Sequence, residues 1–247
     1  MTSRELAFYT SPPHACGYLP RRSAVTVFAD PSAPMDMATY SRLIEYGFRR
    51  SGSHVYVPRC PGCQACLPAR LPVAEFQPDR AQRRTLHANT DITTHILEPS
   101  LREEQFDLYR RYIATRHPGG GMDDPSPDKY LEFLSCDWCE TVFVEFRLKG
   151  KLMAVTVLDV LPQALSAVYT FFDPDLSERS PGRYAVLWSI GETRKRGLAW
   201  LYLGYWIDGC RKMQYKQDYR PIELLQNGRW RRFDTGVTLP NAPSQAC

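Results

Sequence analysis

Residues 141–172 read TVFVEFRLKGKLMAVTVLDVLPQALSAVYTFF and carry the clearest strand pattern of the chain. Apolar side chains alternate at Val142, Val144 and Phe146, which is the period of a strand with one buried face. Lys149-Gly150-Lys151 and the Leu161-Pro162-Gln163 segment are typical of turns. We therefore predict an antiparallel meander of three strands, at residues 141–148, 152–160 and 165–172.

Helical patterns lie on both sides of this meander. A helix is predicted at residues 182–196, and an apolar strand follows it at residues 199–205. Upstream, capping residues and apolar spacing predict four further helices, at residues 36–50, 79–89, 100–118 and 126–134. The order of meander, helix and strand resembles that of acetyltransferase-like (GNAT) domains. We therefore predict an α+β fold in which a GNAT-like antiparallel or mixed sheet is flanked by helices.

Changes in composition divide the chain into three parts. Residues 1–90 form a smaller N-terminal part that begins with a Pro-rich stretch and contains a cluster of cysteines. Residues 91–233 contain the meander and are predicted to form the GNAT-like domain. Residues 234–247 are short, polar and Pro-containing, which predicts a loose C-terminal tail.

The overall composition is that of an ordinary folded protein. The chain is 43% hydrophobic and 23% charged, and its net charge of +4 permits an RNA partner without requiring one. No apolar run approaches the roughly 20 residues that span a bilayer. The first residues lack the basic stretch and apolar core of a secretory signal. We therefore expect a cytoplasmic protein that contacts no membrane, in a compartment where disulfides are rare.

Basic and aromatic residues alternate between Tyr205 and Phe233. Cations bind a phosphate backbone, and aromatic rings stack on unpaired bases, so this segment suits an RNA partner. The alternative is a helix and a strand with a solvated charged face.

Three of the eight cysteines occur within seven residues, in Cys60-Pro-Gly-Cys63-Gln-Ala-Cys66. Two-residue spacers let a turn direct thiolates at one centre, and a structural zinc site takes four ligands. Cys16 is the natural fourth ligand, and His14 is a poorer alternative. Four thiolates also suit an iron–sulfur cluster, and the remaining alternative is a set of buried reduced thiols. The second pair, Cys136 and Cys139, is expected to pack in the interior.

Several ordered blocks of sequence resemble the arginyltransferase family, and in particular its bacterial branch, the aspartate/glutamate leucyltransferases. The resemblance covers residues 8 to about 233 and is far more specific than any one motif. The blocks are Cys16-Gly-Tyr18-Leu19-Pro20, Tyr46-Gly-Phe48-Arg49-Arg50-Ser51-Gly52, the Cys cluster from Tyr56 to Arg70, Asp159 to Pro174, Tyr202-Leu203-Gly204-Tyr205-Trp206-Ile207 and Lys212-Met213-x-Tyr215-Lys216.

This resemblance implies an enzyme that moves leucine from leucyl-tRNA to proteins with N-terminal Asp or Glu and so marks them for degradation. It also implies a GNAT-type fold in the C-terminal half. The loop Arg179-Ser180-Pro181-Gly182-Arg183-Tyr184 lies where GNAT enzymes hold a pyrophosphate, but Tyr184 replaces the final small residue. A ring there hinders the close approach of a pyrophosphate, which favours an acyl carrier other than coenzyme A.

The implied chemistry is attack of a free amine on an aminoacyl ester, which needs neither a cofactor nor a covalent nucleophile. The enzyme has to accept a proton and stabilise an oxyanion. Tyr169 and Tyr205, on predicted strands, could donate to the carbonyl oxygen, and Asp159 could hold or deprotonate the ammonium. The alternative for each is a core residue with a paired polar group.

Each substrate requires cations. An arginine pairs best with the carboxylate of the acceptor's first side chain, and the candidates are Arg49, Arg50 and Arg70. The tRNA is assigned to Arg211, Lys212, Lys216 and Arg220 with Tyr215, as exposed residues that contact phosphates and bases.

Three alternatives remain open. Arginine could replace leucine as the donor amino acid, because the blocks do not encode side-chain specificity. An acyl-CoA-dependent GNAT acetyltransferase would need an intact pyrophosphate loop. A zinc-ribbon-like RNA-binding module would use the Cys cluster and the basic aromatic segment but would leave the long meander unexplained.

Overall fold

The computed structural model describes residues 5–116 and 125–240, and its strands form three sheets. The helices are Met37–Glu45 (α1), Arg80–Ala88 (α2), Glu103–Arg116 (α3), Pro127–Leu134 (α4), Pro181–Lys195 (α5) and Arg211–Gln214 (α6), with short 3₁₀ helices at Pro174–Arg179 (η1) and Tyr215–Asp218 (η2). The strands are Phe8–Thr10 (β1), His14–Ala15 (β2), Ser23–Ala24 (β3), Thr26–Ala29 (β4), Arg49–Ser51 (β5), His54–Pro58 (β6), Leu67–Pro72 (β7), Ile92–Leu97 (β8), Thr141–Leu148 (β9), Lys151–Leu161 (β10), Ala164–Phe172 (β11), Trp200–Trp206 (β12), Ile222–Gln226 (β13) and Arg229–Phe233 (β14).

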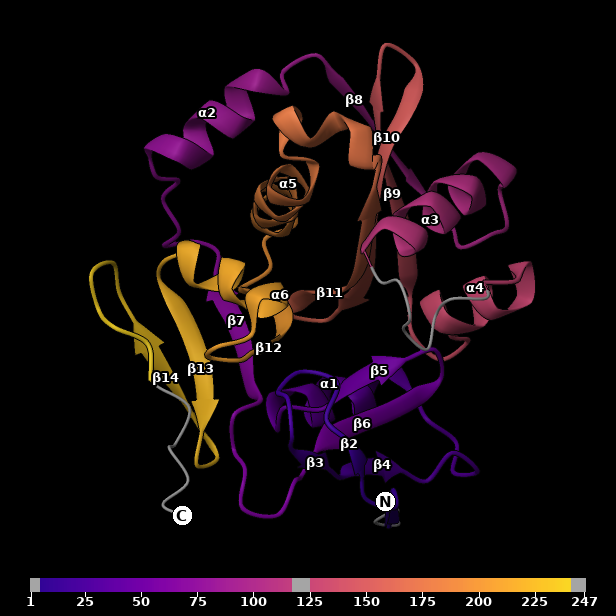
Figure 1. Cartoon of the computed structure of the whole chain (residues 1–247), viewed down its shortest axis with the longest axis vertical. Coiled ribbons are helices and arrows are strands. Elements are labelled where there is room, and N and C mark those ends of the chain that lie inside the picture. Colours follow the sequence, from indigo (N-terminus) through magenta and orange to yellow (C-terminus); the bar gives the residue numbers. More distant parts are fainter. Residues whose placement is uncertain (1–4, 117–124, 241–247) are drawn as a thin grey trace.

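The largest sheet has eight strands in the order β14-β13-β7-β12-β11-β10-β9-β8 (Figure 1). Strands β9, β10 and β11 form the predicted antiparallel meander. Helix α5 then crosses over, so that β12 lies parallel to β11, whereas β7 is antiparallel to β12. The prediction of a mixed sheet flanked by helices is thus confirmed.

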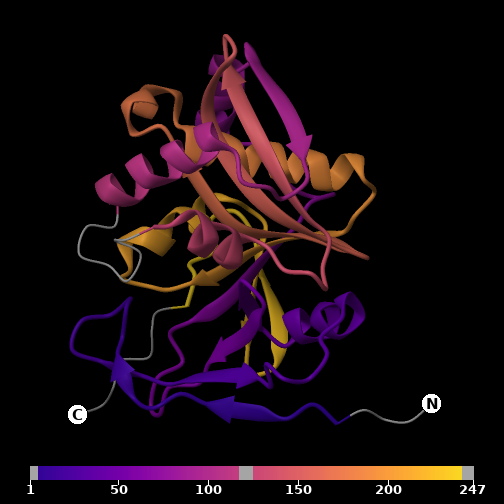
Figure 2. The same cartoon turned by 90° about the vertical axis from the view of Figure 1, so that its right-hand side faces the viewer.

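Helices cover both faces of the meander. Ala154 and Leu158 of β10 belong to the core that α5 closes, whereas Val155 and Val157 belong to the core closed by α3 and α4. Figure 2 shows α3 and α5 on opposite sides of these strands. Successive strand residues point to opposite faces, so the apolar run in β10 is that of a strand buried on both sides. No helix in the described parts of the chain is both long and apolar enough to cross a bilayer.

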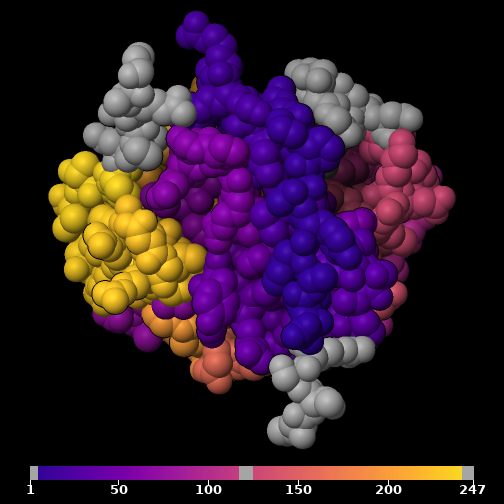
Figure 3. All heavy atoms as spheres, turned by 90° about the horizontal axis from the view of Figure 1, so that it is seen from below, coloured from indigo at the N-terminus to yellow at the C-terminus, as the bar shows by residue number. Residues whose placement is uncertain are grey.

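The N-terminal part contributes to the large sheet as well as to a smaller one. Its own sheet has the order β1-β4-β6-β5, and β2 pairs with β3. Strand β7 follows this small sheet in the chain but lies between β13 and β12 in the large sheet. Figure 3 shows the purple N-terminal part packed against the yellow C-terminal part. The predicted domain boundary at residue 90 therefore assigns β7 to the N-terminal part, although β7 is a strand of the large sheet.

Two details depart from the sequence expectations. Helix α1 ends at Glu45 rather than near residue 50, because Gly47 has a φ of +89°, a left-handed conformation that cannot continue an α-helix. Of the predicted loose tail, 234–247, the structure describes residues 234–240, and Leu239 is buried in the core beside α5. The remainder of that tail lies outside the described residues.

Candidate active site where two strands diverge

Strands β11 and β12 pair over only part of their length. Their parallel ladder joins Ala164, Leu165 and Ser166 to Trp200, Leu201 and Tyr202, although both strands continue beyond these residues. Gly204 follows on β12 with a φ of +78°, a backbone conformation that favours glycine. Beyond Ser166 and Tyr202, the backbone groups by which β11 and β12 would face each other are therefore not used in pairing these two strands.

Arg49 of β5 reaches across from the small sheet to this point. Its Nη1 donates to Ser166 Oγ at 3.1 Å, and its Nη2 donates to the carbonyl oxygen of Ala167 at 2.5 Å. A Cβ on Gly204 would lie 3.8 Å from both Nε and Nη2 of Arg49. A Cβ at position 204 would thus be in van der Waals contact with the guanidinium of Arg49, a residue that is only 8% exposed.

Lys216 of η2 reaches the same point from the other side. Its Nζ lies 3.8 Å from the position of a Cβ on Gly204, donates to the carbonyl oxygen of Tyr205 and contacts Met213 Sδ at 3.2 Å. The residue is 3% exposed. Burial, and then the positive charge of Arg49, lower the pKa of Lys216 from 10.5 to about 7.

Arg49 and Lys216 are two buried cations without a carboxylate partner among the described residues. A buried charge costs on the order of several kcal/mol unless an opposite charge or hydrogen bonds compensate it. Here neutral acceptors supply the compensation, and the charge of Arg49 disfavours the charged form of Lys216. An anionic group that entered beside Gly204 would meet both cations.

Arg50, the next residue on β5, is fully occupied. Its Nε donates to Asp159 Oδ2 at 2.7 Å and its Nη2 to Asp159 Oδ1 at 2.5 Å, with both side chains inaccessible to solvent. Thr141 Oγ1 donates to the same carboxylate at 2.9 Å. This geometry does not support the predicted roles: Arg50 cannot reach an acceptor, and Asp159 is saturated by structural partners and cannot hold or deprotonate the ammonium.

Arg70 of β7 also has partners. Its Nε donates to Glu223 Oε2 at 2.8 Å, and its guanidinium carbon lies 3.7 Å and 4.2 Å from the ring centroids of Trp200 and Trp230. Such stacking between two indole rings, with a carboxylate at the edge, fixes the strands of the sheet. Of the three predicted arginines, Arg49 alone lacks a carboxylate partner within the described residues.

The two predicted tyrosines differ in whether their hydroxyls already have hydrogen-bond partners. Tyr205 donates to the carbonyl oxygen of Gly47 at 2.9 Å, so its hydroxyl is already used. The hydroxyl of Tyr169 on β11 is buried and has no hydrogen-bond partner among the described residues. Burial raises the pKa of Tyr169, so the phenol stays protonated and able to donate. Tyr169 therefore remains a candidate, and Tyr205 has a structural bond instead.

The residues assigned to tRNA do not form one exposed surface. Arg211, Lys212 and Tyr215 are exposed on and after α6, as expected. Lys216 is buried, so the expectation of an exposed Lys216 is wrong, because η2 turns its side chain toward β12. Arg220 is half-buried and donates to the carbonyl oxygens of Gln217 and Phe233.

Cys16 lies beside the three clustered cysteines. Cys16, Cys60 and Cys66 line one pocket of about 140 Å³. Burial, and then the neighbouring thiols, including that of Cys63, raise the pKa of Cys66 to about 12. Backbone N–H groups of Leu19 and Val25 donate to Cys16 Sγ and Cys60 Sγ, each at 3.4 Å. Amides that face sulfur would stabilise thiolates at a metal.

Over the described ranges, however, no group of three or more His, Cys, Asp or Glu side chains is arranged to hold a metal ion. The seven cysteines that the structure describes are free thiols. A zinc or iron–sulfur site at Cys16, Cys60, Cys63 and Cys66 therefore stays a prediction. Metal analysis of anaerobically purified protein tests it: about one zinc ion, or one cluster, per chain is expected, and protein free of both metals would contradict it.

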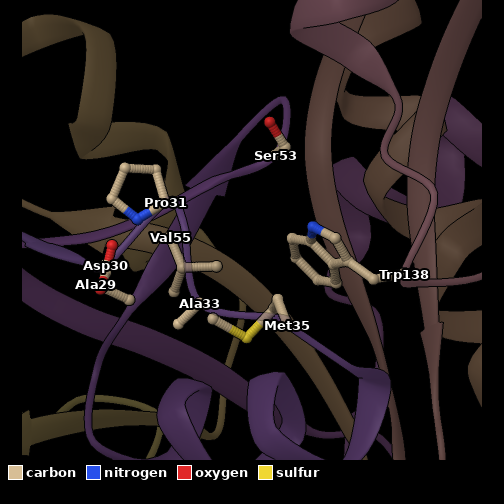
Figure 4. A pocket seen from close by; sticks show the side chains of 8 residues that line it. All are labelled: Ala29, Asp30, Pro31, Ala33, Met35, Ser53, Val55 and Trp138. Carbon is tan, nitrogen blue, oxygen red and sulfur yellow. The ribbon is translucent and has the colours of Figure 1, made fainter. Parts of the chain in front are cut away.

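A second hollow, of about 100 Å³, is lined by none of the residues of β11 and β12. Figure 4 shows its lining, which comes from residues 29–55 together with Trp138. Asp30 is the charged residue of the lining, and its carboxylate accepts hydrogen bonds from the backbone and the hydroxyl of Ser32. The residues that line this hollow include no cation and none of the predicted catalytic residues.

The comparisons with known proteins agree with this architecture. A family model for the N terminus of arginine-tRNA-protein transferases matches residues 14–84, and one for the C terminus matches residues 104–226. These matches place the chain in a class of transferases. The crystal structure of FemX is 7% identical in sequence and has a TM-score of 0.50. The match covers 88% of this chain and 86% of FemX, and it is a likeness of fold alone.

Closer relatives identify the branch. An aspartate/glutamate leucyltransferase of Pseudomonas fluorescens is 55% identical over 225 residues, covering 91% of this chain and 96% of that protein. One from Pseudomonas aeruginosa is 56% identical with the same coverage. The chain belongs to the aspartate/glutamate leucyltransferase family.

Proposed function

We propose that this protein transfers leucine from leucyl-tRNA to the N-terminal Asp or Glu of acceptor proteins and so marks them for degradation. The observation that carries the proposal is the buried pair Arg49 and Lys216 where β11 and β12 diverge, which has no carboxylate partner among the described residues. A site for an acidic residue requires cations that have no carboxylate of their own. The exposed basic residues of α6 lie just before Lys216 along the chain and suit an RNA backbone.

The reaction exchanges an ester for an amide. The acceptor's amine nitrogen forms a bond to the leucyl carbonyl carbon, the bond to the ribose oxygen breaks, and the amine's proton is passed to that oxygen. Because the ester is already activated, holding the reactants in place supplies most of the rate. Tyr169 is the candidate donor to the oxyanion, because its buried hydroxyl has no hydrogen-bond partner among the described residues.

The contacts of the loop from Arg179 to Tyr184 disfavour acetyl-CoA as the acyl donor. The ring of Tyr184 is buried and lies 5.3 Å from that of Phe146, so it is part of the core beside α5. Arg179 is held by Asp91 at 2.7 Å. A Cβ on Gly182 would lie 3.1 Å from the ring of Phe172, so this glycine serves packing. A GNAT-like fold that uses aminoacyl-tRNA fits these contacts, and we expect it to act in the cytoplasm, where charged tRNA is present.

A transfer assay tests the donor and the acceptor together. Labelled leucyl-, arginyl- and phenylalanyl-tRNA are each offered to peptides that begin with Asp, Glu, Lys or Arg. We expect label from leucyl-tRNA on the Asp and Glu peptides, because only their side chains can pair with the buried cations. Transfer of arginine in place of leucine would change the donor and keep the acceptor. Transfer to the Lys peptide alone, or to none, would contradict the proposal.

The exposed residues of α6 predict a salt-dependent grip on tRNA. Replacing Arg211 and Lys212 with Ala should weaken tRNA binding, and the salt slope of log K should fall by about one unit for each phosphate that the variant no longer binds. Stability should change little, because exposed charges contribute little. Binding is measured at several salt concentrations, with Arg84→Ala and Lys195→Ala, two exposed basic residues on other helices, as the control. An unchanged slope in the α6 variant would show that tRNA binds elsewhere.

A further inference from the structure

We propose that Arg49 and Lys216 together bind the side-chain carboxylate of the acceptor's N-terminal Asp or Glu, and that this pair sets the acceptor specificity. The proposal rests on the proposed function and assigns its acidic substrate group to two residues. We refer to Arg49 and Lys216, which converge beside Gly204, as the carboxylate clamp.

The geometry of the clamp is fixed before any ligand arrives. Arg49 is held by Ser166 and by the carbonyl oxygen of Ala167, and Lys216 is held by the carbonyl oxygen of Tyr205. These contacts use part of the donor capacity, since a guanidinium has five N–H groups and an ammonium has three. Both cations approach the same point, 3.8 Å from where a side chain at position 204 would begin. Preorganised donors of this kind bind an anion without further ordering cost.

Burial favours a carboxylate at the end of a side chain over a phosphate of RNA. Arg49 and Lys216 are 8% and 3% exposed, and they lie at the edge of a sheet ladder rather than on the surface. A phosphodiester is linked to the RNA chain on both sides, so it is better served by exposed cations such as those of α6. An N-terminal side chain has a free end, so its carboxylate suits two buried cations better than a phosphodiester does.

The clamp also explains discrimination against neutral isosteres. Asn or Gln in place of Asp or Glu would occupy the same volume but would bring an amide without charge and with N–H groups facing two cations. A site built for a particular polar group rejects an analogue that leaves its buried groups unpaired. Acceptor selection between acid and amide therefore follows from these two side chains.

Binding of a carboxylate should be coupled to protonation of Lys216. The titratable groups that act on the charge of Lys216 are Arg49 of β5 and the thiols of Cys66 and Cys210. Its ammonium also contacts the backbone carbonyl oxygen of Tyr205 and lies 5.6 Å from the ring of Tyr215. None of these is a carboxylate. With a pKa of about 7, Lys216 is mostly neutral at pH 8. An arriving carboxylate favours the ammonium, so one proton is taken from the solvent.

Calorimetry of the full chain at pH 8 tests this coupling. A peptide that begins with Asp, and a matched one that begins with Asn, are titrated in two buffers with different ionisation enthalpies. We expect an uptake of about one proton per Asp peptide, from the titration of one group with the pKa given above, and none for the Asn peptide. Equal uptake for the two peptides overturns the proposal. Uptake on addition of uncharged tRNA instead, with none for the Asp peptide, would assign the pair to RNA and also overturns it.

Variants test specificity with a readout that a structural role would not change. In Lys216→Met and Arg49→Gln, the ratio of kcat/KM for Asp over Asn peptides should fall by about 100-fold, the range measured for buried charge pairs, while tRNA affinity is retained. Lys195→Met and Arg84→Gln, in exposed positions, should keep the ratio of the unmodified protein.

Failure of the clamp is distinguishable from failure of the proposed function. If the unmodified protein moves no leucine to any peptide, the proposed function is wrong. If it does, and Lys216→Met keeps the full preference for Asp over Asn, only the clamp is wrong. The calorimetric test on the unmodified protein stands even if a variant fails to fold.

Discussion

Replacing Asp159 with Ala lowers the free energy of unfolding by about 3–5 kcal/mol, the range for breaking a buried ion pair by removing one partner. The reason is the guanidinium of Arg50, which keeps its place between the two sheets but loses the carboxylate that accepts two of its hydrogen bonds. The remaining acceptors are the hydroxyl of Thr141 and the carbonyl oxygens of Gly52 and Leu134. Urea unfolding at pH 7 measures the loss.

The matched control removes both charges at once. The double variant Arg50→Met with Asp159→Leu replaces the pair by apolar groups of similar size and should recover most of the lost stability, because no buried charge is left alone. Asp91→Ala breaks the more exposed ion pair with Arg179 and should cost much less than Asp159→Ala, because water screens an exposed pair. A loss below about 1 kcal/mol for Asp159→Ala would show that Asp159 is not tied to Arg50 in this way, and its predicted catalytic role would again be open.

The contrast between Arg49 and Arg50 shows where sequence reasoning stops. Both residues lie in one matched block, and either could have been the acceptor's partner. Side chains of adjacent strand residues point in opposite directions, so only one can face the diverging strands. Which one does so depends on Ser166 and Asp159, more than 100 positions away along the chain. Local pattern carries no information about such partners.

The secondary structure of the central region was predictable because it is encoded locally. The bounds of β9 are those predicted, and Lys149 and Gly150 form its turn with φ angles of 51° and 83°. The hairpin of β13 and β14 carried the same kind of signal and was missed. Asn227-Gly228, with φ angles of 50° and 74°, is a dipeptide typical of a tight hairpin turn. The position of β7 between β13 and β12 could not be predicted, because it depends on long-range pairing.

The burial of Lys216 is a further property that no local pattern reveals. Basic residues in a basic segment are normally solvated, and Arg211 and Lys212 are. Lys216 differs because η2 follows α6 directly and directs this one side chain at Gly204. From the sequence, Arg49 is assigned to the acceptor and Lys216 to tRNA, so the carboxylate clamp could not be predicted.

Replacing Lys216 with Met raises the free energy of unfolding at pH 6, although it weakens acceptor selection. The pKa of Lys216 is about 7 in the folded chain against 10.5 for an ordinary lysine. The unfolded chain therefore binds more protons between these two values, so the stability of the unmodified protein rises with pH across that interval. The cost of burying the charge is fully present below pH 7 and disappears above about pH 10.5, and each pKa unit corresponds to about 1.4 kcal/mol.

From this interval the full cost is at most about 5 kcal/mol, and loss of the hydrogen bond to the carbonyl oxygen of Tyr205 offsets about 1 kcal/mol of the gain. We expect Lys216→Met to be more stable by about 2–4 kcal/mol at pH 6 and by much less at pH 9.5. Urea unfolding at the two pH values measures the difference, with Lys195→Met unchanged at both. A lysine kept for stability would give a loss at both pH values, and that result would remove the physical reason for expecting an anion between Arg49 and Lys216. A gain confined to low pH, together with a weaker preference for Asp over Asn, would mean that the chain retains a destabilising buried charge because its acceptor neutralises it.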